Sequence, residues 1–92
     1  MVYVYPAVFH QVGEVVNVYY PDLACVSQGD NYLDAFRMAR EALSLHLYGM
    51  TVEGYELPAP SRLEDIPLGK GDALALIELD LEGFTPDWEL KE

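Results

Sequence analysis

The segment from Tyr19 to Leu47 places the tightest constraint on how this chain can fold, because it predicts several elements in a set order. Pro21 cannot donate to a strand ladder, so the strand that carries Tyr19 should end there. Residues 23–28 alternate well enough to form a short strand, and Gly29 has the backbone freedom to leave it. The segment therefore predicts the end of one strand, a second short strand, a tight corner and a long helix.

The helix should begin after Asn31, a good N-cap residue, with Asp34 three residues later in a capping-box arrangement. It should cover residues 32–48, with Gly49 as its C-cap. Its apolar residues recur at helical spacing: Ala35, Phe36, Ala39, Ala42, Leu43, Leu47 and Met50. The alanines among them would let the helix lie close to a sheet.

Three more segments have the composition of strands. Residues 2–9 and 14–20 are rich in β-branched and aromatic residues, and a turn at residues 10–13 should join them. Residues 72–81 should form the last strand, and their apolar start favours a central or doubly covered position. The order β-β-β-α-β predicts an α+β fold, with one antiparallel-rich sheet of about four strands and one long helix packed on one face.

A long connection over residues 51–70 separates the helix from the last strand and contains Pro58, Pro60 and Pro67. Because proline fixes φ and interrupts a ladder, we expect an ordered surface loop with one short turn near residues 62–65. The chain has no internal repeat, low-complexity tract or linker. We therefore expect residues 1–92 to form a single domain.

One helix can cover only one face of such a sheet, yet residues 2–9 are apolar or aromatic on both sides. An exposed apolar face of that size usually marks an interface. We therefore expect a homo-dimer or higher oligomer, or a complex in which a partner covers this face. The alternative is that the proline-rich loop and the tail with Phe84 and Trp88 fold back over it.

The charge is strongly negative, with 16 acidic residues against five basic ones and a net charge of −11. Such a field repels nucleic-acid phosphates and favours a basic partner, although it also suits a surface that serves only solubility. A single cysteine fits a reducing compartment, so we expect a cytoplasmic protein. The apolar N-terminus lacks the basic leader of a signal peptide, and no apolar run is long enough to span a membrane.

The residues that usually carry chemistry are few and scattered. His10 and His46 fall on different elements, and Cys25 should be a small buried hydrophobic residue rather than a nucleophile. The β-β-β-α-β order resembles a ribonuclease H core, whose two metal ions need converging carboxylates, but the first strand has no acid. We therefore expect no enzyme activity, no metal and no cofactor.

A set of short motifs in this order resembles the HicB antitoxin family, and the resemblance covers about residues 3–80. The motifs are Tyr5-Pro6-Ala7-Val8-Phe9, Tyr20-Pro21-Asp22-Leu23, Gln28-Gly29-Asp30 with Asn31 after it, Asp34-Ala35, Ala39-Arg40-Glu41-Ala42-Leu43 and Pro58-Ala59-Pro60-Ser61. Two features depart from the family. Only Ala24 separates Leu23 from Cys25, where many members have Pro-Gly, and the DNA-binding segment found at the C-terminus of many members has no counterpart here.

The resemblance implies a degraded ribonuclease H-like fold and a protein-binding function. HicB proteins bind and neutralise HicA, a small basic ribonuclease toxin with a double-stranded-RNA-binding-like fold, and they commonly form dimers or larger assemblies. Occlusion of the toxin's basic RNA surface and catalytic histidine would be the mechanism, and an acidic chain suits it. Without the DNA-binding segment, we expect no direct binding of nucleic acid.

Contacts with the toxin are predicted from residue type, since tyrosine and tryptophan anchor interfaces and acids pair with basic groups. The predicted contact residues are Tyr32, Asp34, Phe84, Asp87, Trp88 and Glu89. Trp88 could instead cap the core. Two other functions stay open: a solitary HicB-like binding or regulatory module without a toxin, and a metal-dependent nuclease that would depend on Asp22 or Asp80.

Overall fold

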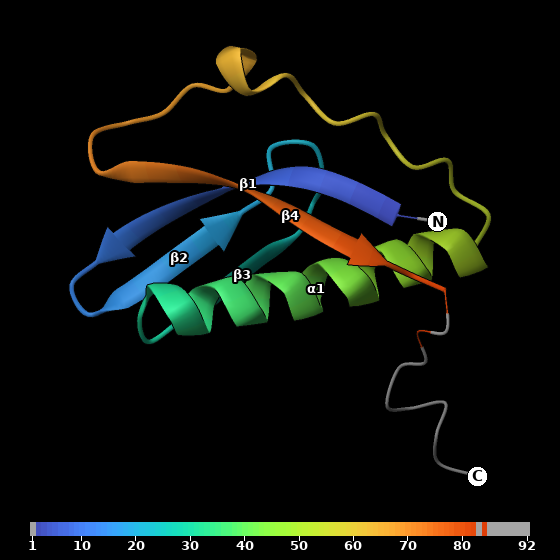
Figure 1. The fold of residues 1–92 in the computed structure, drawn as a ribbon, viewed down its shortest axis with the longest axis horizontal. Helices are drawn as coiled ribbons and strands as arrows, with labels where there is room; N and C mark the ends of the chain where they lie inside the picture. Colours follow the sequence, from blue (N-terminus) through green and yellow to red (C-terminus); the bar gives the residue numbers. More distant parts are fainter. Residues whose placement is uncertain (1, 83, 85–92) are drawn as a thin grey trace, which may run out of the picture.

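The computed structural model describes residues 2–82 and 84, and it contains one sheet, one long helix and a long loop (Figure 1). In chain order the elements are β1 (Val2–Val12), β2 (Val15–Tyr19), β3 (Val26–Gly29), α1 (Tyr32–Val52), the short 3-10 helix η1 (Leu63–Asp65) and β4 (Asp72–Asp80). The predicted α+β class and the order β-β-β-α-β are confirmed.

The four strands form an antiparallel sheet in the order β3-β2-β1-β4. The prediction of a central or doubly covered last strand was wrong, because β4 is an edge strand and β1 lies in the middle. In β4, Ile77 and Leu79 are buried on the helix side, whereas Leu76 on the other side is 51% exposed. The apolar residues of β4 therefore include a partly exposed row.

Two strand boundaries differ from the sequence prediction. The first strand extends to Val12 because its last residues pair with the start of β2, and a two-residue turn with Gly13 at φ 62° joins the two strands. The third strand begins only at Val26. Backbone hydrogen bonds from Tyr20 to Cys25 and from Leu23 to Tyr20 form a turn from the residues before it.

Helix α1 packs along one face of the sheet and forms the core with it. The buried residues of the sheet side are Tyr5, Ala7, Phe9, Val16, Val18, Ile77 and Leu79, and those of the helix are Ala35, Ala39, Leu43 and Leu47. Of the predicted helical stripe, these four residues are buried, Ala42 and Met50 are half-buried, and Phe36 is 40% exposed. Cys25 is buried in the same core, as predicted.

The helix starts where the sequence predicts but ends later. The Asn31 side chain accepts a hydrogen bond from the backbone N–H of Asp34, which confirms it as the N-cap. Gly49 was predicted as the C-cap, but it lies inside the helix, which continues to Val52. The chain leaves the helix at Gly54, whose φ of 80° is a conformation that glycine adopts readily.

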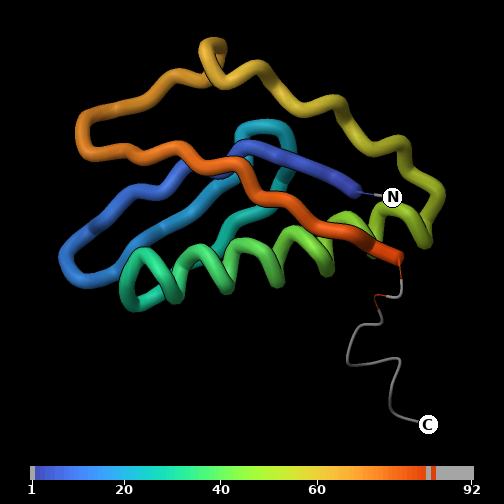
Figure 2. The backbone as a smooth tube through the Cα atoms, viewed as in Figure 1, coloured from blue at the N-terminus to red at the C-terminus, as the bar shows by residue number. Residues whose placement is uncertain are grey.

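The long loop after α1 runs over the side of the sheet opposite the helix (Figures 1 and 2). It contains η1, which confirms the predicted short turn. Ile66 in the loop is buried, as are Pro6 and Val8, whose side chains point away from the helix. The loop therefore covers the middle of the outer face, which the sequence analysis raised as the alternative to a partner.

Candidate partner-binding surfaces

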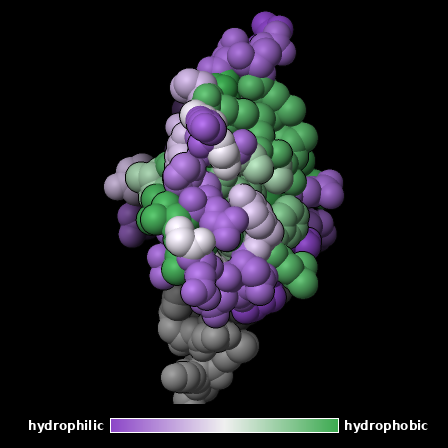
Figure 3. All heavy atoms as spheres, turned by 90° about the vertical axis from the view of Figure 1, so that its left-hand side faces the viewer, coloured by the Kyte–Doolittle hydropathy of each residue, from purple (hydrophilic) through white to green (hydrophobic). Residues whose placement is uncertain are grey.

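The outer face of the sheet, opposite α1, keeps a large apolar surface in spite of the loop. Along β1, residues that point outward alternate with residues of the core. The strand register places the outward residues of β2, β3 and β4 on the same face as the outward residues of β1. The large hydrophobic residues that stay exposed on this face are Val2, Val4, Val12, Val15, Tyr19, Val26 and Leu76. An end-on view of the molecule shows hydrophobic residues gathered on one side and hydrophilic residues on the other (Figure 3).

Buried Pro6 and Val8 divide these exposed residues into two groups of different charge. One group, which we call the acidic half, lies on β1 and β4 and consists of Val2, Val4, Leu76, Glu78 and Asp80, with Val4 opposite Glu78 and Val2 opposite Asp80. The other, which we call the uncharged half, lies mainly on β2 and β3 and consists of Val12, Val15, Asn17, Tyr19, Val26 and Gln28.

The uncharged half contains a shallow hollow with both apolar and amide walls. It is lined by His10, Asn17, Tyr19, Val26 and Gln28, among others. In the register, Tyr19 lies opposite Val26 and Asn17 lies opposite Gln28. These residues were not among the predicted contacts, although the alternation of Val15, Asn17 and Tyr19 with two valines is visible in the sequence.

His10 and Asp72 connect this region to the start of β4. The Nδ1 atom of His10 lies 2.6 Å from Oδ1 of Asp72, and the other carboxylate oxygen accepts a hydrogen bond from the backbone N–H of Gly69 at 2.7 Å. The Gly69 N–H and then the His10 side chain hold the pKa of Asp72 below its usual range. These contacts hold the end of the loop against the central strand.

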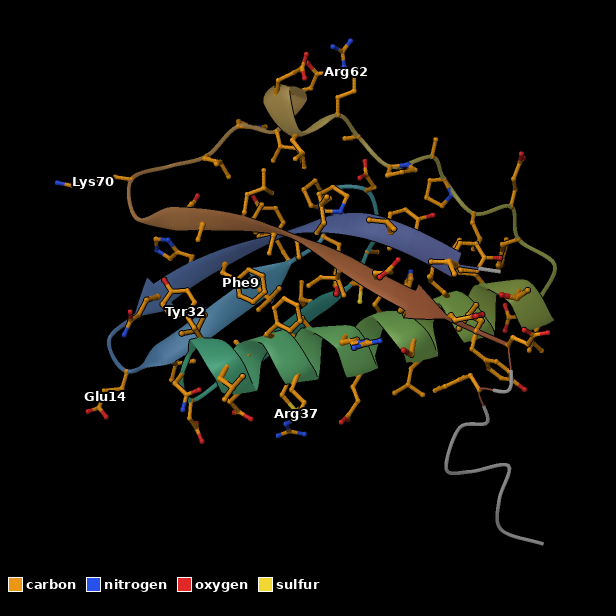
Figure 4. All side chains as sticks on the ribbon, in the orientation of Figure 1. Phe9, Glu14, Tyr32, Arg37, Arg62 and Lys70 are labelled. Atoms are coloured by element: carbon orange, nitrogen blue, oxygen red, sulfur yellow. The ribbon has the colours of Figure 1, made fainter. Side chains whose placement is uncertain are left out.

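The start of α1 carries two of the predicted contact residues. Tyr32 is 44% exposed and lies beside the buried ring of Phe9, with ring centroids 6.4 Å apart (Figure 4). Asp34 accepts hydrogen bonds from the Asp30 backbone N–H at 2.9 Å and from Arg37 at 2.7 Å, and these contacts hold its pKa below the usual range. Tyr32 is available to a partner, whereas the Asp34 carboxylate already has two donors.

The third predicted contact residue that the structure describes is far from these two. Phe84 packs edge-on against Tyr48 near the other end of α1, with ring centroids 5.5 Å apart. Tyr48 follows Tyr32 by sixteen positions, which corresponds to about 24 Å of helix. Asp87, Trp88 and Glu89 lie outside the described residues. The structure therefore does not bring the described contact residues together into one patch.

Exposed hydrophobic residues beside Tyr32 enlarge the surface at the start of α1. Leu33 is 83% exposed, and Phe36 stacks on Phe9 with ring centroids 6.2 Å apart while remaining partly exposed. A second shallow hollow lies here, between Leu33, Phe36 and the charged side chains that follow them on the helix. Arg37 points away from the sheet on this side (Figure 4).

The family-like motifs have structural roles in the fold. A Cβ on Gly29 would lie 2.3 Å from the backbone nitrogen of Ala35, so the motif glycine lets α1 start directly against β3. Asp22 accepts hydrogen bonds from the backbone N–H and the hydroxyl of Ser61, which fastens the proline-rich loop to the turn after β2.

Two tyrosines of the motifs complete this framework. The Tyr5 hydroxyl donates to the carbonyl of Pro58 at 2.5 Å, and the Tyr20 hydroxyl donates to the carbonyl of Ala39 at 2.6 Å. Burial raises the pKa of both phenols, which therefore stay protonated as donors at neutral pH. These bonds hold the loop and the helix in place.

Within residues 2–82 and 84, no three or more His, Cys, Asp and Glu side chains lie close enough together to hold a metal ion. Burial raises the pKa of the Cys25 thiol, which keeps it in the unreactive protonated form. In the part of the chain that the structure describes, no helix is long and apolar enough to cross a membrane.

Comparison with known proteins links this arrangement to antitoxins. A family model described as the HicB_like antitoxin of bacterial toxin-antitoxin system matches residues 5–89. An uncharacterized 14.9 kDa protein in the rep-hol intergenic region of Haemophilus phage HP1 is 32% identical over an alignment of 81 residues, and the match covers 84% of this chain. The chain spans 61% of the length of that relative.

Two solved structures share the fold of this chain and are more than a quarter identical to it in sequence. The N-terminal domain of the antitoxin HicB from Burkholderia pseudomallei is 27% identical, with a TM-score of 0.69 over 86% of this chain and 100% of that one. A chain in a HicA3 and HicB3 toxin-antitoxin complex is 26% identical, with a TM-score of 0.64 over 85% of this chain and 99% of that one.

Proposed function

Because this chain belongs to the HicB-like antitoxin family of bacterial toxin-antitoxin systems, we propose that it binds a small, basic HicA-type ribonuclease toxin and blocks that toxin's RNA surface. The family match over residues 5–89 is the observation that carries the proposal. The protein acts by occlusion, without a catalytic step or a cofactor of its own, and it does so in the cytoplasm.

Charge supports a basic partner. The net charge is −11, and none of the strands β1 to β4 contains a lysine or an arginine. Opposite potentials accelerate encounter and disfavour wrong partners. In the HicA3 and HicB3 complex, a structural relative of this chain is found together with a toxin, which supports the same kind of partner here.

The toxin contacts remain those expected from residue type. Tyr32 anchors the contact at the start of α1, and exposed Leu33 and Phe36 widen the apolar surface around it. Asp34 contributes charge at the same place. Phe84 with Asp87, Trp88 and Glu89 forms a second contact segment, so the toxin would touch the protein near both ends of α1.

Co-purification of the tagged chain from extract of its source cells tests the proposal directly. We expect recovery of a basic protein of fewer than about 100 residues, whose RNA cleavage stops when the chain is added in equimolar amount. Recovery of the chain alone at physiological salt would favour a solitary HicB-like module. Metal-dependent cleavage of nucleic acid that is lost in Asp22→Asn or Asp80→Asn would favour a nuclease.

The contact residues are tested by variants of exposed aromatic side chains. We expect Tyr32→Ala to weaken toxin binding by at least about tenfold, because a buried aromatic anchor would be lost. Leu63→Ala is the control, since Leu63 in η1 is 44% exposed, as Tyr32 is, and lies away from both ends of α1; it should leave the affinity unchanged. If Trp88→Ala changes the affinity by less than about twofold, the tail is not a contact segment.

A further inference from the structure

We propose that the uncharged half of the outer sheet face is the contact between two copies of this chain, related by a two-fold axis. The residues of this contact are Val12, Val15, Asn17, Tyr19, Val26 and Gln28. The inference gives a location to the self-association expected from the sequence and does not depend on toxin binding.

Exposure of apolar side chains provides the driving force. Val26 is 74% exposed and Tyr19, opposite it, is 42% exposed, while Val12 and Val15 form a second exposed apolar pair between β1 and β2. Burial of such surface is favourable in proportion to the apolar area removed from water. Two antiparallel neighbouring strands also present a firm surface, since each apolar side chain has a fixed partner across the ladder.

Charge decides which part of the face can meet a copy of itself. Each copy carries −11, so a contact that placed acids opposite acids would be opposed by repulsion. The acidic half would do so through Glu78 and Asp80. The six residues of the uncharged half have no carboxylate, lysine or arginine side chain. Glu14 lies at the border of this half, in the turn between Val12 and Val15, and Asp72 lies beyond His10, with which it is paired. Two copies that meet through this half therefore bring fewer like charges together than two copies that meet through the acidic half.

The polar groups of this half also suit a two-fold contact. Asn17 and Gln28 lie opposite each other and are exposed. An amide carries both donors and acceptors, so the amides of one copy can pair with those of the other, whereas two carboxylates cannot. The hollow beside them offers a recess for an apolar side chain of the second copy.

A basic toxin is a poorer fit for this half than a second copy. Its lysines and arginines would meet no carboxylate there and would lose water without compensation. Negative groups that a toxin needs lie elsewhere, among them Glu78 and Asp80 of the acidic half. Toxin binding at the uncharged half is therefore the competing outcome for the experiment.

Sedimentation velocity of the full chain and its variants, without toxin, tests the contact. We expect the natural sequence to sediment as a dimer, with twice the chain mass of 10.3 kDa, at micromolar concentration. Val26→Glu should raise the dimer dissociation constant by at least about thirtyfold. Asn17→Asp, which keeps the side-chain shape and adds like charges across the axis, should also weaken the dimer.

Two controls separate this surface from the rest of the molecule. Leu33→Glu on the helix and Leu76→Glu on the acidic half place the same charge at exposed hydrophobic residues and should leave the dimer intact. Circular dichroism of each variant should show the same fold as the natural chain. A monomeric natural chain at about 100 μM, or a dimer unaffected by both Val26→Glu and Asn17→Asp, would overturn the inference.

Added toxin distinguishes this inference from the proposed function. We expect Val26→Glu to bind the toxin as the natural chain does. Loss of toxin binding in Val26→Glu, with a natural chain that is monomeric, would assign the uncharged half to the toxin and overturn the dimer contact. A toxin that binds no variant would leave the dimer result standing and would remove only the proposed function.

Discussion

Gly29 lies where β3 meets the start of α1, and the space there admits no side chain. A Cβ would lie 2.3 Å from the nitrogen and 2.5 Å from the Cα of Ala35. Because backbone atoms cannot give way as the end of a side chain can, we expect Gly29→Ala to lower the free energy of unfolding by about 2 kcal/mol or more. Urea denaturation followed by circular dichroism measures the change.

Gly49 offers a matched glycine control inside α1. A Cβ there would meet no atom within 4 Å, so Gly49→Ala should raise the free energy of unfolding by about 0.5–1 kcal/mol through the better helix propensity of alanine. If Gly29→Ala were as stable as the natural chain, the close approach of the helix to β3 would be wrong. The sequence predicted freedom of the backbone at Gly29, whereas the structure shows that lack of space also requires glycine there.

At the scale of elements, the loop after α1 is held to the sheet by few polar contacts. The Ser61 backbone N–H donates to Asp22 at 2.9 Å, and the Ser61 hydroxyl donates to the other carboxylate oxygen. We expect Asp22→Ala to cost about 1–2 kcal/mol and to speed hydrogen exchange at the Ser61 amide, because both bonds are lost. Hydrogen exchange measured by mass spectrometry or NMR reports on this amide.

An ion pair in the same loop serves as the control. Arg62 and Glu64 form an exposed pair, and Arg62 points outward from η1 (Figure 4). Glu64→Gln should leave both stability and exchange at Ser61 unchanged, since exposed pairs contribute little. Unchanged exchange at Ser61 in Asp22→Ala would show that the loop is held by Ile66 and its apolar neighbours instead.

For the whole molecule, the net charge of −11 implies opposite responses of the two proposed contacts to salt. Association with a basic toxin is accelerated by attraction, so its rate constant should fall at least about tenfold between 50 mM and 500 mM salt. Self-association through the uncharged half is opposed by repulsion between two acidic copies, so it should strengthen over the same range. Stopped-flow and sedimentation velocity measure the two responses, and a dimer that salt dissociates would contradict this assignment.

Features of the fold that depend on neighbouring residues in the sequence could be predicted, whereas several element boundaries could not. The start of α1 depends on Asn31 and its neighbours, and the burial of Val16 and Val18 depends on simple alternation, so both were predictable. The extension of β1 to Val12 depends on pairing with β2, and the extent of α1 depends on the turn at Gly54. The first boundary depends on a contact with another strand, and the second depends on which of two nearby glycines, Gly49 or Gly54, ends the helix.

The candidate surfaces show the same limit. The sequence indicated a sheet face that one helix could not cover, and it indicated Tyr32 as an exposed aromatic residue. It could not indicate that Tyr19 lies opposite Val26, because that register is set by where β3 begins. Tyr32 and Phe84 were both predicted from residue type to contact the toxin, although the structure places them near opposite ends of α1.

By itself, then, the sequence determined the order of elements, the inward and outward residues of each strand and the acidic character of the chain, because these follow from neighbours along the chain and from composition. Only the tertiary structure decided that β4 pairs with β1 at an edge and that Ile66 covers the middle of the outer face. Both depend on how a long loop returns across the sheet. That return leaves the acidic half and the uncharged half as separate surfaces, and we propose self-association only at the uncharged half.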